Sequence, residues 1–264
     1  MELQLVQTPL AGLVYQKDLI LLLVTFGGML FVMLLEQCWP RRSQDTAPAL
    51  RWLFNWGLAT CNFFAMIFLA IYLGGWLAVH APGPLLPLFE YLPAVPAVAL
   101  VFILIEGIAY GIHRLFHRIP ALWYLHSVHH SDCAVDATTS HRHHLGEVFL
   151  SSMLLLPVPL LLGVPPGYVV LVALLRLSLT IFNHGNLAIP SGVDRALRPL
   201  VVTPDFHRVH HARDRTLADS NFGIAVPWFD YLFGTARTIP PDAQVRVPLG
   251  VGIEEEDAPF PATL

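Results

Sequence analysis

Histidine is concentrated in one part of this sequence, at spacings that suit metal coordination. Twelve of the thirteen histidines lie between positions 113 and 211, and only His80 lies outside that range. Imidazole is the most common metal ligand in proteins, and clustering many imidazoles is costly unless they serve a purpose. We therefore predict that the chain builds a metal site from its histidines.

The spacing of these histidines places several of them on single helical faces, because residues three or four apart are neighbours on a helix. The pattern occurs in three segments, which hold His113 and His117; His126, His129 and His130; and His207, His210 and His211. The last segment follows Thr203-Pro204, a favourable helix start with threonine as the N-cap and proline in the first turn. With His184, converging helices would offer nine nitrogens. A zinc site takes three or four ligands, so nine nitrogens suit two ions better than one.

The remaining motifs narrow the chemistry. We expect His143, in the loop segment 141–144, to be either a metal ligand or a residue that orients one, and His80 to lie at the membrane interface. The sequence has no H-E-x-x-H, G-x-S-x-G, P-loop or dinucleotide-binding motif. Without a built-in nucleophile or base, no catalytic residue is predicted beyond the metal ligands. Imidazole suits Fe, Cu, Zn and Ni alike, but redox chemistry with dioxygen fits these motifs better than hydrolysis does.

The composition places this histidine-rich region in a membrane protein. Hydrophobic residues make up 55% of the chain, charged residues only 13%, and the mean hydropathy is +0.59. All three values lie on the membrane side of the average for soluble proteins. The net charge of −4 and the lack of a basic face argue against nucleic acid as a partner. The N-terminus lacks the basic start and the cleavage site of a signal peptide, so we expect it to belong to the mature chain.

Apolar runs predict the membrane-spanning elements. Three runs of spanning length cover about residues 19–35, 51–80 and 95–112, and a fourth apolar region covers 148–182. The sequence Gly163-Val164-Pro165-Pro166-Gly167 cannot continue a helix, so the fourth region is predicted to be a hairpin. Each arm has about 15 residues and is roughly 23 Å long, slightly short for a bilayer.

Charged residues predict which side of the membrane carries the histidines. Basic residues follow the first and third runs and the hairpin, whereas none lies between the second and third runs. The positive-inside rule therefore places every histidine motif on the cytoplasmic face. We predict an all-α integral membrane protein with about four transmembrane helices, a short return arm of the hairpin and a cytoplasmic helical histidine-rich cap. Its predicted regions are an N-terminal transmembrane region (1–95), a catalytic region (96–244) and a C-terminal tail (245–264).

Two sets of motifs extend the histidine pattern into a longer signature. The first set runs from Glu106 through His113-Arg114-x-x-His117 and Leu122-Trp123 to His126-x-x-His129-His130-Ser131. The second set contains Asn183-His184-Gly185-Asn186, Thr203-Pro204-x-x-His207-Arg208-Val209-His210-His211, Asn221-Phe222-Gly223 and Trp228-Phe229-Asp230-Tyr231-Leu232-Phe233-Gly234-Thr235. In this ordered set, over residues 98–238, the chain resembles the fatty acid hydroxylase and sterol desaturase superfamily.

The resemblance implies a membrane-bound non-haem diiron enzyme that uses dioxygen and externally supplied electrons to hydroxylate or desaturate a lipid. Carried over residue by residue, the metal ligands are His113, His117, His126, His129, His130, His184, His207, His210 and His211. The chain departs from the family at His141 and His144, which replace an arginine and a proline, while His143 aligns with a family histidine. Thr180 stands where some relatives have a further histidine.

The expected activity is hydroxylation of a sterol, fatty-acyl or related lipid, with desaturation at the same site as the alternative. The expected cofactors are two Fe ions, which Zn can replace in a purified sample, and O2 is the co-substrate. Neutral imidazoles leave such a site highly cationic, so nearby polar groups are expected to orient the ligands. The candidates for this role are Glu106, Asp132, Glu147, Asp219 and Asn221.

The expected partners are a lipid substrate that enters from the bilayer and a separate electron donor of the reductase, ferredoxin or cytochrome b5 type. The acidic run 254–257 is interpreted as part of a solvated tail rather than a docking feature. Two readings from other classes stay open. A membrane metal transporter would hold its histidines within the spans, and a zinc-binding membrane hydrolase or scaffold would need neither dioxygen nor a reductant.

Overall fold

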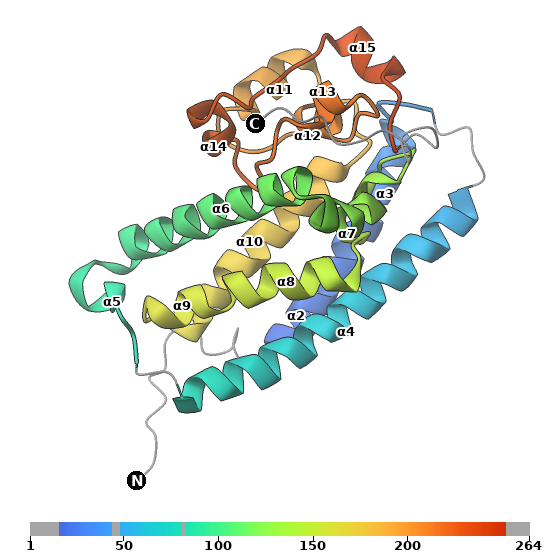
Figure 1. Ribbon diagram of the computed structural model, residues 1–264. Coiled ribbons are helices and arrows are strands. Elements are labelled where there is room, and N and C mark those ends of the chain that lie inside the picture. Colours follow the sequence, from blue (N-terminus) through green and yellow to red (C-terminus); the bar gives the residue numbers. More distant parts are fainter. Residues whose placement is uncertain (1–15, 44–47, 81–82, 252–264) are drawn as a thin grey trace.

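A set of long apolar helices and a cap of short helices make up the molecule (Figure 1). The computed structural model describes residues 16–43, 48–80 and 83–251, and these ranges contain helices but no strand. The predicted all-α class is therefore confirmed. The acidic run 254–257 lies outside the described residues, as does most of the predicted C-terminal tail.

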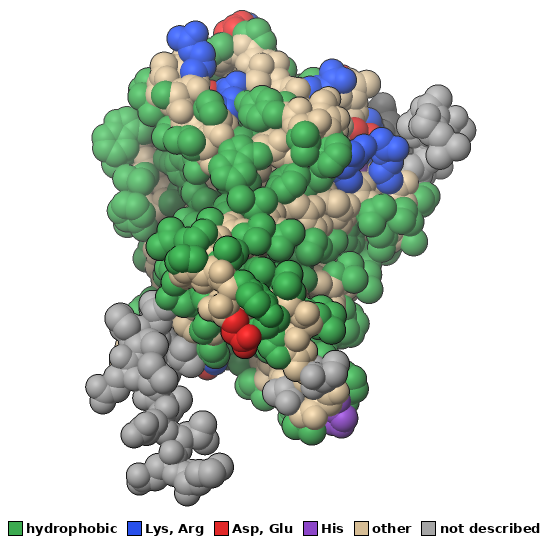
Figure 2. All heavy atoms as spheres, turned by 90° about the vertical axis from the view of Figure 1, so that its left-hand side faces the viewer, with side chains coloured by type: hydrophobic (Ala, Val, Ile, Leu, Met, Phe, Trp, Pro, Cys, Tyr) green, Lys and Arg blue, Asp and Glu red, His purple; other side chains and the backbone are tan. Residues whose placement is uncertain are grey.

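Four of the helices are long and apolar enough to cross a membrane, as predicted: Lys17–Cys38, Pro48–Leu77, Ala94–Arg118 and Pro166–His184. The first consists of α2 (Lys17–Leu22), a π-helical turn (Leu23–Gly27) and α3 (Gly28–Cys38), and the others belong to α4 (Pro48–His80), α6 (Ala94–Arg118) and α10 (Pro166–His184). Hydrophobic side chains cover much of the outer surface in Figure 2, and Lys and Arg gather mainly toward its upper end, where the cap lies. These features identify an integral membrane protein.

The fourth apolar region forms the predicted hairpin. Its first arm is the shorter apolar helix Leu145–Leu161, which consists of α8 (Leu145–Leu155) and α9 (Pro157–Leu161), and its second arm is α10. The chain turns at Gly163, which has a φ of 61°. A side chain there would be strained and would come within 3.2 Å of the backbone of Pro87. The turn is fastened to the segment before α5 (Leu88–Tyr91), because the amide of Leu85 donates to the carbonyl oxygen of Leu161 at 2.9 Å.

The cap is built from short helices at one end of the long ones. It contains α7 (Pro120–His130), the 3₁₀ helix η2 (Ala137–His141), α11 (Ser191–Leu197), α12 (Pro204–His210), α13 (Arg215–Ala218), α14 (Trp228–Leu232) and α15 (Pro241–Arg246). Helix α12 begins as predicted, because the Thr203 hydroxyl accepts from the amide of Phe206 and Pro204 lies in the first turn. The long helix α6 continues past the predicted span end at Ile112 and carries His113 and His117 into the cap region.

Buried carboxylates fasten the cap to the long helices. Glu106 of α6 accepts from the amide of Ala225 at 2.7 Å and from Nε of Arg176 at 2.5 Å. Glu36 of α3 accepts from the amides of Ala137 and Asn186, at 2.9 and 2.8 Å. Each carboxyl group thus joins segments far apart in the sequence, and its buried oxygens accept from amide or guanidinium donors.

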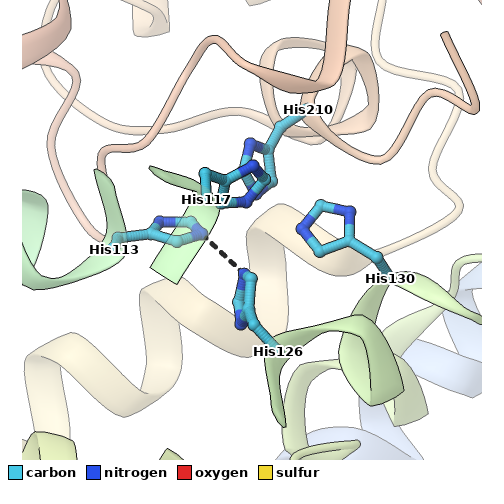
Figure 3. A group of neighbouring side chains, drawn as sticks. All are labelled: His113, His117, His126, His130 and His210. Carbon is cyan, nitrogen blue, oxygen red and sulfur yellow. Dashed lines mark hydrogen bonds between the residues drawn. The ribbon is translucent and has the colours of Figure 1, made fainter. Parts of the chain in front are cut away.

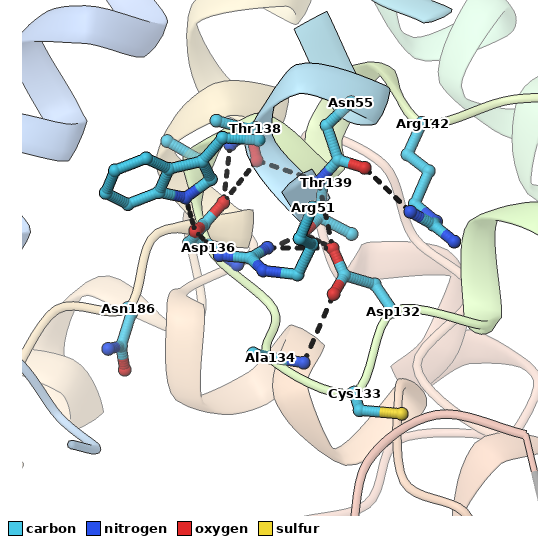
Figure 4. A network of polar contacts seen from close by, with 12 residues as sticks. Arg51, Asn55, Asp132, Cys133, Ala134, Asp136, Thr138, Thr139, Arg142 and Asn186 are labelled. Carbon is cyan, nitrogen blue, oxygen red and sulfur yellow. Dashed lines mark hydrogen bonds and ion pairs between the residues drawn. The ribbon is translucent and has the colours of Figure 1, made fainter. Parts of the chain in front are cut away.

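A second polar network joins α4 to the loop after α7 (Figure 4). Arg51 contacts both Asp132, at 3.0 Å, and Asp136. Asn55 donates to Asp132 at 3.1 Å and accepts from Arg142 at 2.8 Å. Both aspartates are buried, so the position of this loop depends on these contacts.

We expect Arg51→Met to destabilise the protein severely. The change leaves Asp132 and Asp136 buried without their cation, and breaking a buried pair in this way costs about 3–5 kcal/mol. Thermal unfolding in detergent would measure the loss. Arg246→Met is the matched control, because the Arg246–Asp242 pair is exposed and such pairs contribute at most about 1 kcal/mol. Equal melting temperatures for the two variants would contradict the prediction.

Candidate metal centre

The nine histidines predicted as ligands come together in two buried groups. The first group contains His113, His117, His126, His130 and His210, and the second contains His129, His184, His207 and His211. Within each group one nitrogen of every ring lies within 4.8 Å of the corresponding nitrogens of the others. The groups adjoin each other, since the ring centroids of His130 and His211 are 4.7 Å apart.

The division between the groups follows the helical turns. Each pair of histidines four residues apart stays in one group, with His126 and His130 of α7 in the first and His207 and His211 in the second. The histidine at the fourth position of each motif joins the other group: His129 belongs to the second group and His210 to the first. Helix α7 and the α12 segment therefore each contribute to both groups.

The tautomers in the first group favour a bound cation (Figure 3). Nδ1 of His113 lies 2.8 Å from the carbonyl oxygen of Phe222, and Nδ1 of His126 lies 2.7 Å from Oε1 of Glu147. Both oxygens are acceptors, so in neutral rings both Nδ1 atoms carry the proton. The Nε2 atoms of His113 and His126 then face each other with lone pairs at 3.0 Å. A cation that accepts both lone pairs would remove this repulsion.

The second group has the same arrangement around His184. Its Nδ1 donates to the carbonyl oxygen of Thr180 at 2.8 Å, which leaves Nε2 as the free donor atom for a metal. That Nε2 lies 3.2 Å from Nε2 of His129 and 3.0 Å from Nε2 of His207. Three nitrogens therefore converge on one small space, and His211 adds a fourth, 3.3 Å from His207.

Burial keeps His129, His130, His207, His210 and His211 neutral, as metal ligation requires. Removal from water lowers the pKa of His210 to about 3. Burial, followed by the neighbouring imidazoles, also holds the pKa well below the ordinary value of 6.5 for His129, His130, His207 and His211. Six of the nine rings have a buried nitrogen without a hydrogen-bond partner within the described residues. Neutral, unpartnered, converging imidazoles fit a pair of first-row transition metal ions.

Two of the carboxylates predicted to orient ligands contact a histidine. Asp219 accepts from Nδ1 of His117 at 3.0 Å, and Glu147 accepts from Nδ1 of both His126, at 2.7 Å, and His143, at 3.0 Å. The ring of His143 also stacks on that of His129, with centroids 4.3 Å apart. His143, His126 and Glu147 form a further group of three potential metal ligands.

The other three candidates bind elsewhere. Glu106 and Asp132 belong to the networks that fasten the cap and the loop after α7. Asn221 has a φ of 53° and donates to the carbonyl oxygens of Phe206 and Arg237, at 2.7 and 2.9 Å. Its side chain therefore holds backbone segments of the cap together and does not contact an imidazole.

A cavity of about 180 Å³ adjoins both histidine groups. Its lining includes His113 and His126 of the first group and His129, His184 and His207 of the second. The α6 side of the wall is apolar, with Ala109, Ile112 and Phe116, whereas the α10 side carries polar residues. The cavity can therefore hold an apolar chain against both groups.

The sequence assigns no role to two polar residues of this wall, Arg176 and Asn183, although Asn183 stands in the motif around His184. Both lie on α10 and line the cavity. A usable signal existed for Arg176, because a lone charge within an apolar run is a functional candidate by default. The carbonyl partners of His113, His184 and His210 had no signal, since any residue supplies a carbonyl.

We expect Glu147→Gln to weaken metal binding. A neutral amide cannot hold the protonated Nδ1 atoms of His126 and His143 as firmly as the carboxylate does. Loss of such an outer partner typically lowers metal affinity about 10–100-fold. Retained iron after dialysis against a graded series of chelator concentrations measures the effect. Asp242→Asn, at an exposed carboxylate, should retain iron like the unchanged protein, and equal retention by Glu147→Gln would refute this role.

Comparison with known proteins agrees with the site. The family model for fatty acid hydroxylase matches residues 98–235, just over half of the chain. The chain is 32% identical over 137 residues to alkylglycerol monooxygenase of Danio rerio. This alignment covers 52% of the chain and 29% of the relative. It is 33% identical over 141 residues to protein CER1-like 2 of Arabidopsis thaliana, and this alignment covers 50% of the chain and 22% of the relative. It is 28% identical over 144 residues to ornithine lipid hydroxylase OlsE of Rhizobium tropici, and that alignment covers 54% of the chain and 42% of the relative.

These alignments span less than half of each relative's own length. No solved structure matches the chain. The matched residues contain both histidine groups, the cavity-lining part of α10 and Glu106. On the extent of the family match, this chain belongs to the fatty acid hydroxylase family.

Proposed function

We propose that the protein is a membrane-bound, non-haem diiron hydroxylase that oxidises an unactivated C–H bond of a lipid. The observation that carries the proposal is the pair of adjoining, buried histidine groups that line one cavity. The relatives named as lipid monooxygenases and hydroxylases support the reaction class. The family membership supports iron and dioxygen as cofactor and co-substrate.

The two histidine groups would each hold one iron, the first with five candidate imidazoles and the second with four. Bound iron would supply the reduction of dioxygen and an oxidant strong enough for a C–H bond, which no protein acid or base provides. His143 stacks against the second group and would support His129 rather than replace a ligand. The domain division into 1–95, 96–244 and 245–264 remains a prediction on which this proposal does not depend.

The chain's own residues orient the ligands and exclude water. Asp219 and Glu147 fix the Nδ1 proton on His117 and His126, which directs each Nε2 toward the centre of the first group. Phe116 and Ile112 give the cavity an apolar wall beside His113. A lipid chain bound there presents its C–H bonds to the histidine groups while bulk water is kept out.

The orientation and the electron supply belong to the same proposal. Arg41, Arg42 and Arg51 contact Asp205 of α12, the carbonyl oxygen of Val247 and Asp132, so they lie at the end of the long helices that carries the cap. By the positive-inside rule this end is the cytoplasmic one. The lipid would enter from the bilayer. A separate electron donor of the reductase, ferredoxin or cytochrome b5 type would dock on the cytoplasmic side.

The deciding experiment incubates the iron-loaded protein with a membrane lipid extract, dioxygen and a chemical reductant, followed by mass spectrometry of the lipids. A lipid that gains one oxygen atom identifies a hydroxylase, and one that loses two hydrogen atoms identifies a desaturase. Matched incubations without dioxygen and with zinc-loaded protein should give neither product. Lipid cleavage that proceeds without dioxygen would replace the proposal with a zinc hydrolase.

A further inference from the structure

One side of the cavity wall is a polar stripe on the membrane helix α10. Arg176, Thr180, Asn183 and His184 follow one another at intervals of four, three and one residues, so they share one face of the helix. All four line the cavity. Arg176 lies eight residues before His184, about 12 Å along the helix axis. The stripe therefore extends from the second histidine group deep into the substrate cavity.

Arg176 has hydrogen-bonding capacity that the protein does not use. Its Nε donates to Glu106 at 2.5 Å. Within the described residues its two terminal nitrogens have no hydrogen-bond partner, although arginine commonly binds a carboxylate through two parallel bonds. Glu106 is satisfied by other donors as well, since it accepts from the amides of Ala225 and Val226. The guanidinium is thus held in place through Nε, and its two terminal nitrogens can donate to a ligand.

Asn183 is a second, independent sign of a polar ligand. Its Nδ2 donates to the carbonyl oxygen of Ile224 at 2.7 Å, which fixes the orientation of the amide because a carbonyl only accepts. Its Oδ1 is left buried without a hydrogen-bond partner in the described part of the chain, and the residue is only 2% exposed. An unpaired buried acceptor is costly, so its place in the wall of a cavity points to cavity contents that include a hydrogen-bond donor, either a hydroxyl group or a water molecule bound with the ligand.

We propose that the cavity selects a lipid that bears an oxygen substituent, which accepts hydrogen bonds from Arg176 while the carbon to be oxidised lies at the histidine groups. This inference rests on the proposed function, because it names the substrate class of the same site. The bound oxygen is that of a hydroxyl, ether or carboxylate group. A plain hydrocarbon would leave the guanidinium unsolvated in the cavity and is therefore disfavoured.

Binding measurements on the full chain in detergent test the proposal without relying on turnover. A fluorescent long-chain lipid is displaced by an alkane or by the alcohol, methyl ether or acid of equal chain length. We expect the three oxygen-bearing probes to bind about tenfold more tightly than the alkane, the gain typical of a charge-assisted hydrogen bond. The preference should appear in both metal-free and iron-loaded protein.

Variants assign the preference to Arg176. In Arg176→Met it should disappear, and Arg176→Lys should keep part of it. Because the methionine variant leaves Glu106 uncompensated, the double variant Arg176→Met with Glu106→Gln removes both charges and guards against a folding defect. Leu175→Met, at a side chain that is 47% exposed on the same helix, should bind like the unchanged protein.

Equal binding of alkane and alcohol by the unchanged protein overturns the proposal, as does a preference that survives both in Arg176→Met and in the double variant with Glu106→Gln. The outcomes also separate it from the proposed function. Oxygen-selective binding without any oxidised product under iron, dioxygen and reductant would contradict the hydroxylase and keep the binding site. Oxidation of alkane and alcohol with equal KM would do the reverse.

Discussion

Removing both members of the pair His207 and His211 should lower bound iron from two ions to one per chain and abolish lipid oxidation. The double variant His207→Ala with His211→Ala leaves the second group with two imidazoles, whereas the first group keeps all five of its members. Two imidazoles are too few to hold the ion, since stable sites use three or more protein ligands. The loss should exceed the roughly 10–100-fold reduction in affinity caused by changing an outer partner.

Iron content by elemental analysis and product formation by mass spectrometry give the two readouts. The matched control is His80→Ala with His144→Ala, because these histidines belong to neither group and are exposed. It should keep two ions and full activity. If the His207–His211 variant lost both ions, the groups would not be independent sites. If it retained both, the second group would not be a metal site.

Much of the fold could be predicted from the sequence because membrane helices leave a strong local signal. The length of the apolar runs was enough to predict the membrane-spanning helices. Pro165 and Pro166 with their flanking glycines were enough to predict the hairpin. Similarly, Thr203 and Pro204 correctly predicted where α12 begins. Helix α6 extends beyond the end of its apolar run at Ile112, because a helix that leaves the membrane can continue with polar residues.

The composition of the candidate site was predictable, but its internal division was not. Spacing identifies eight histidines that share helical faces, and these eight meet in the structure together with His184, which has no such spacing partner. Which group His129 or His210 joins depends on how α7 and α12 are rotated against each other, and spacing within one helix does not contain that information. The same limit applies to carboxylates, since Glu147 contacts a histidine of the first group and Glu106 contacts none.

Filling the cavity should abolish lipid oxidation while leaving the metal ions in place. Ala109 lines the cavity from α6, one helical turn before His113. In Ala109→Trp the indole would occupy the space proposed for the substrate chain beside the histidine groups. We expect product formation to fall by at least about a hundredfold, because even small displacements of a reacting group have effects of that size. Iron content should stay unchanged, since all nine histidines are kept.

The comparison with Ala121→Trp separates blockage from the general cost of a large side chain. Ala121 is an exposed residue of α7, so an indole there projects away from the cavity and should leave turnover intact. A graded series at position 109, from valine through leucine to tryptophan, should lower the turnover of long-chain lipids step by step. Because the histidine groups stay intact throughout the series, a progressive loss locates the substrate in this cavity. Full activity in Ala109→Trp would mean that the lipid approaches the histidines by another route.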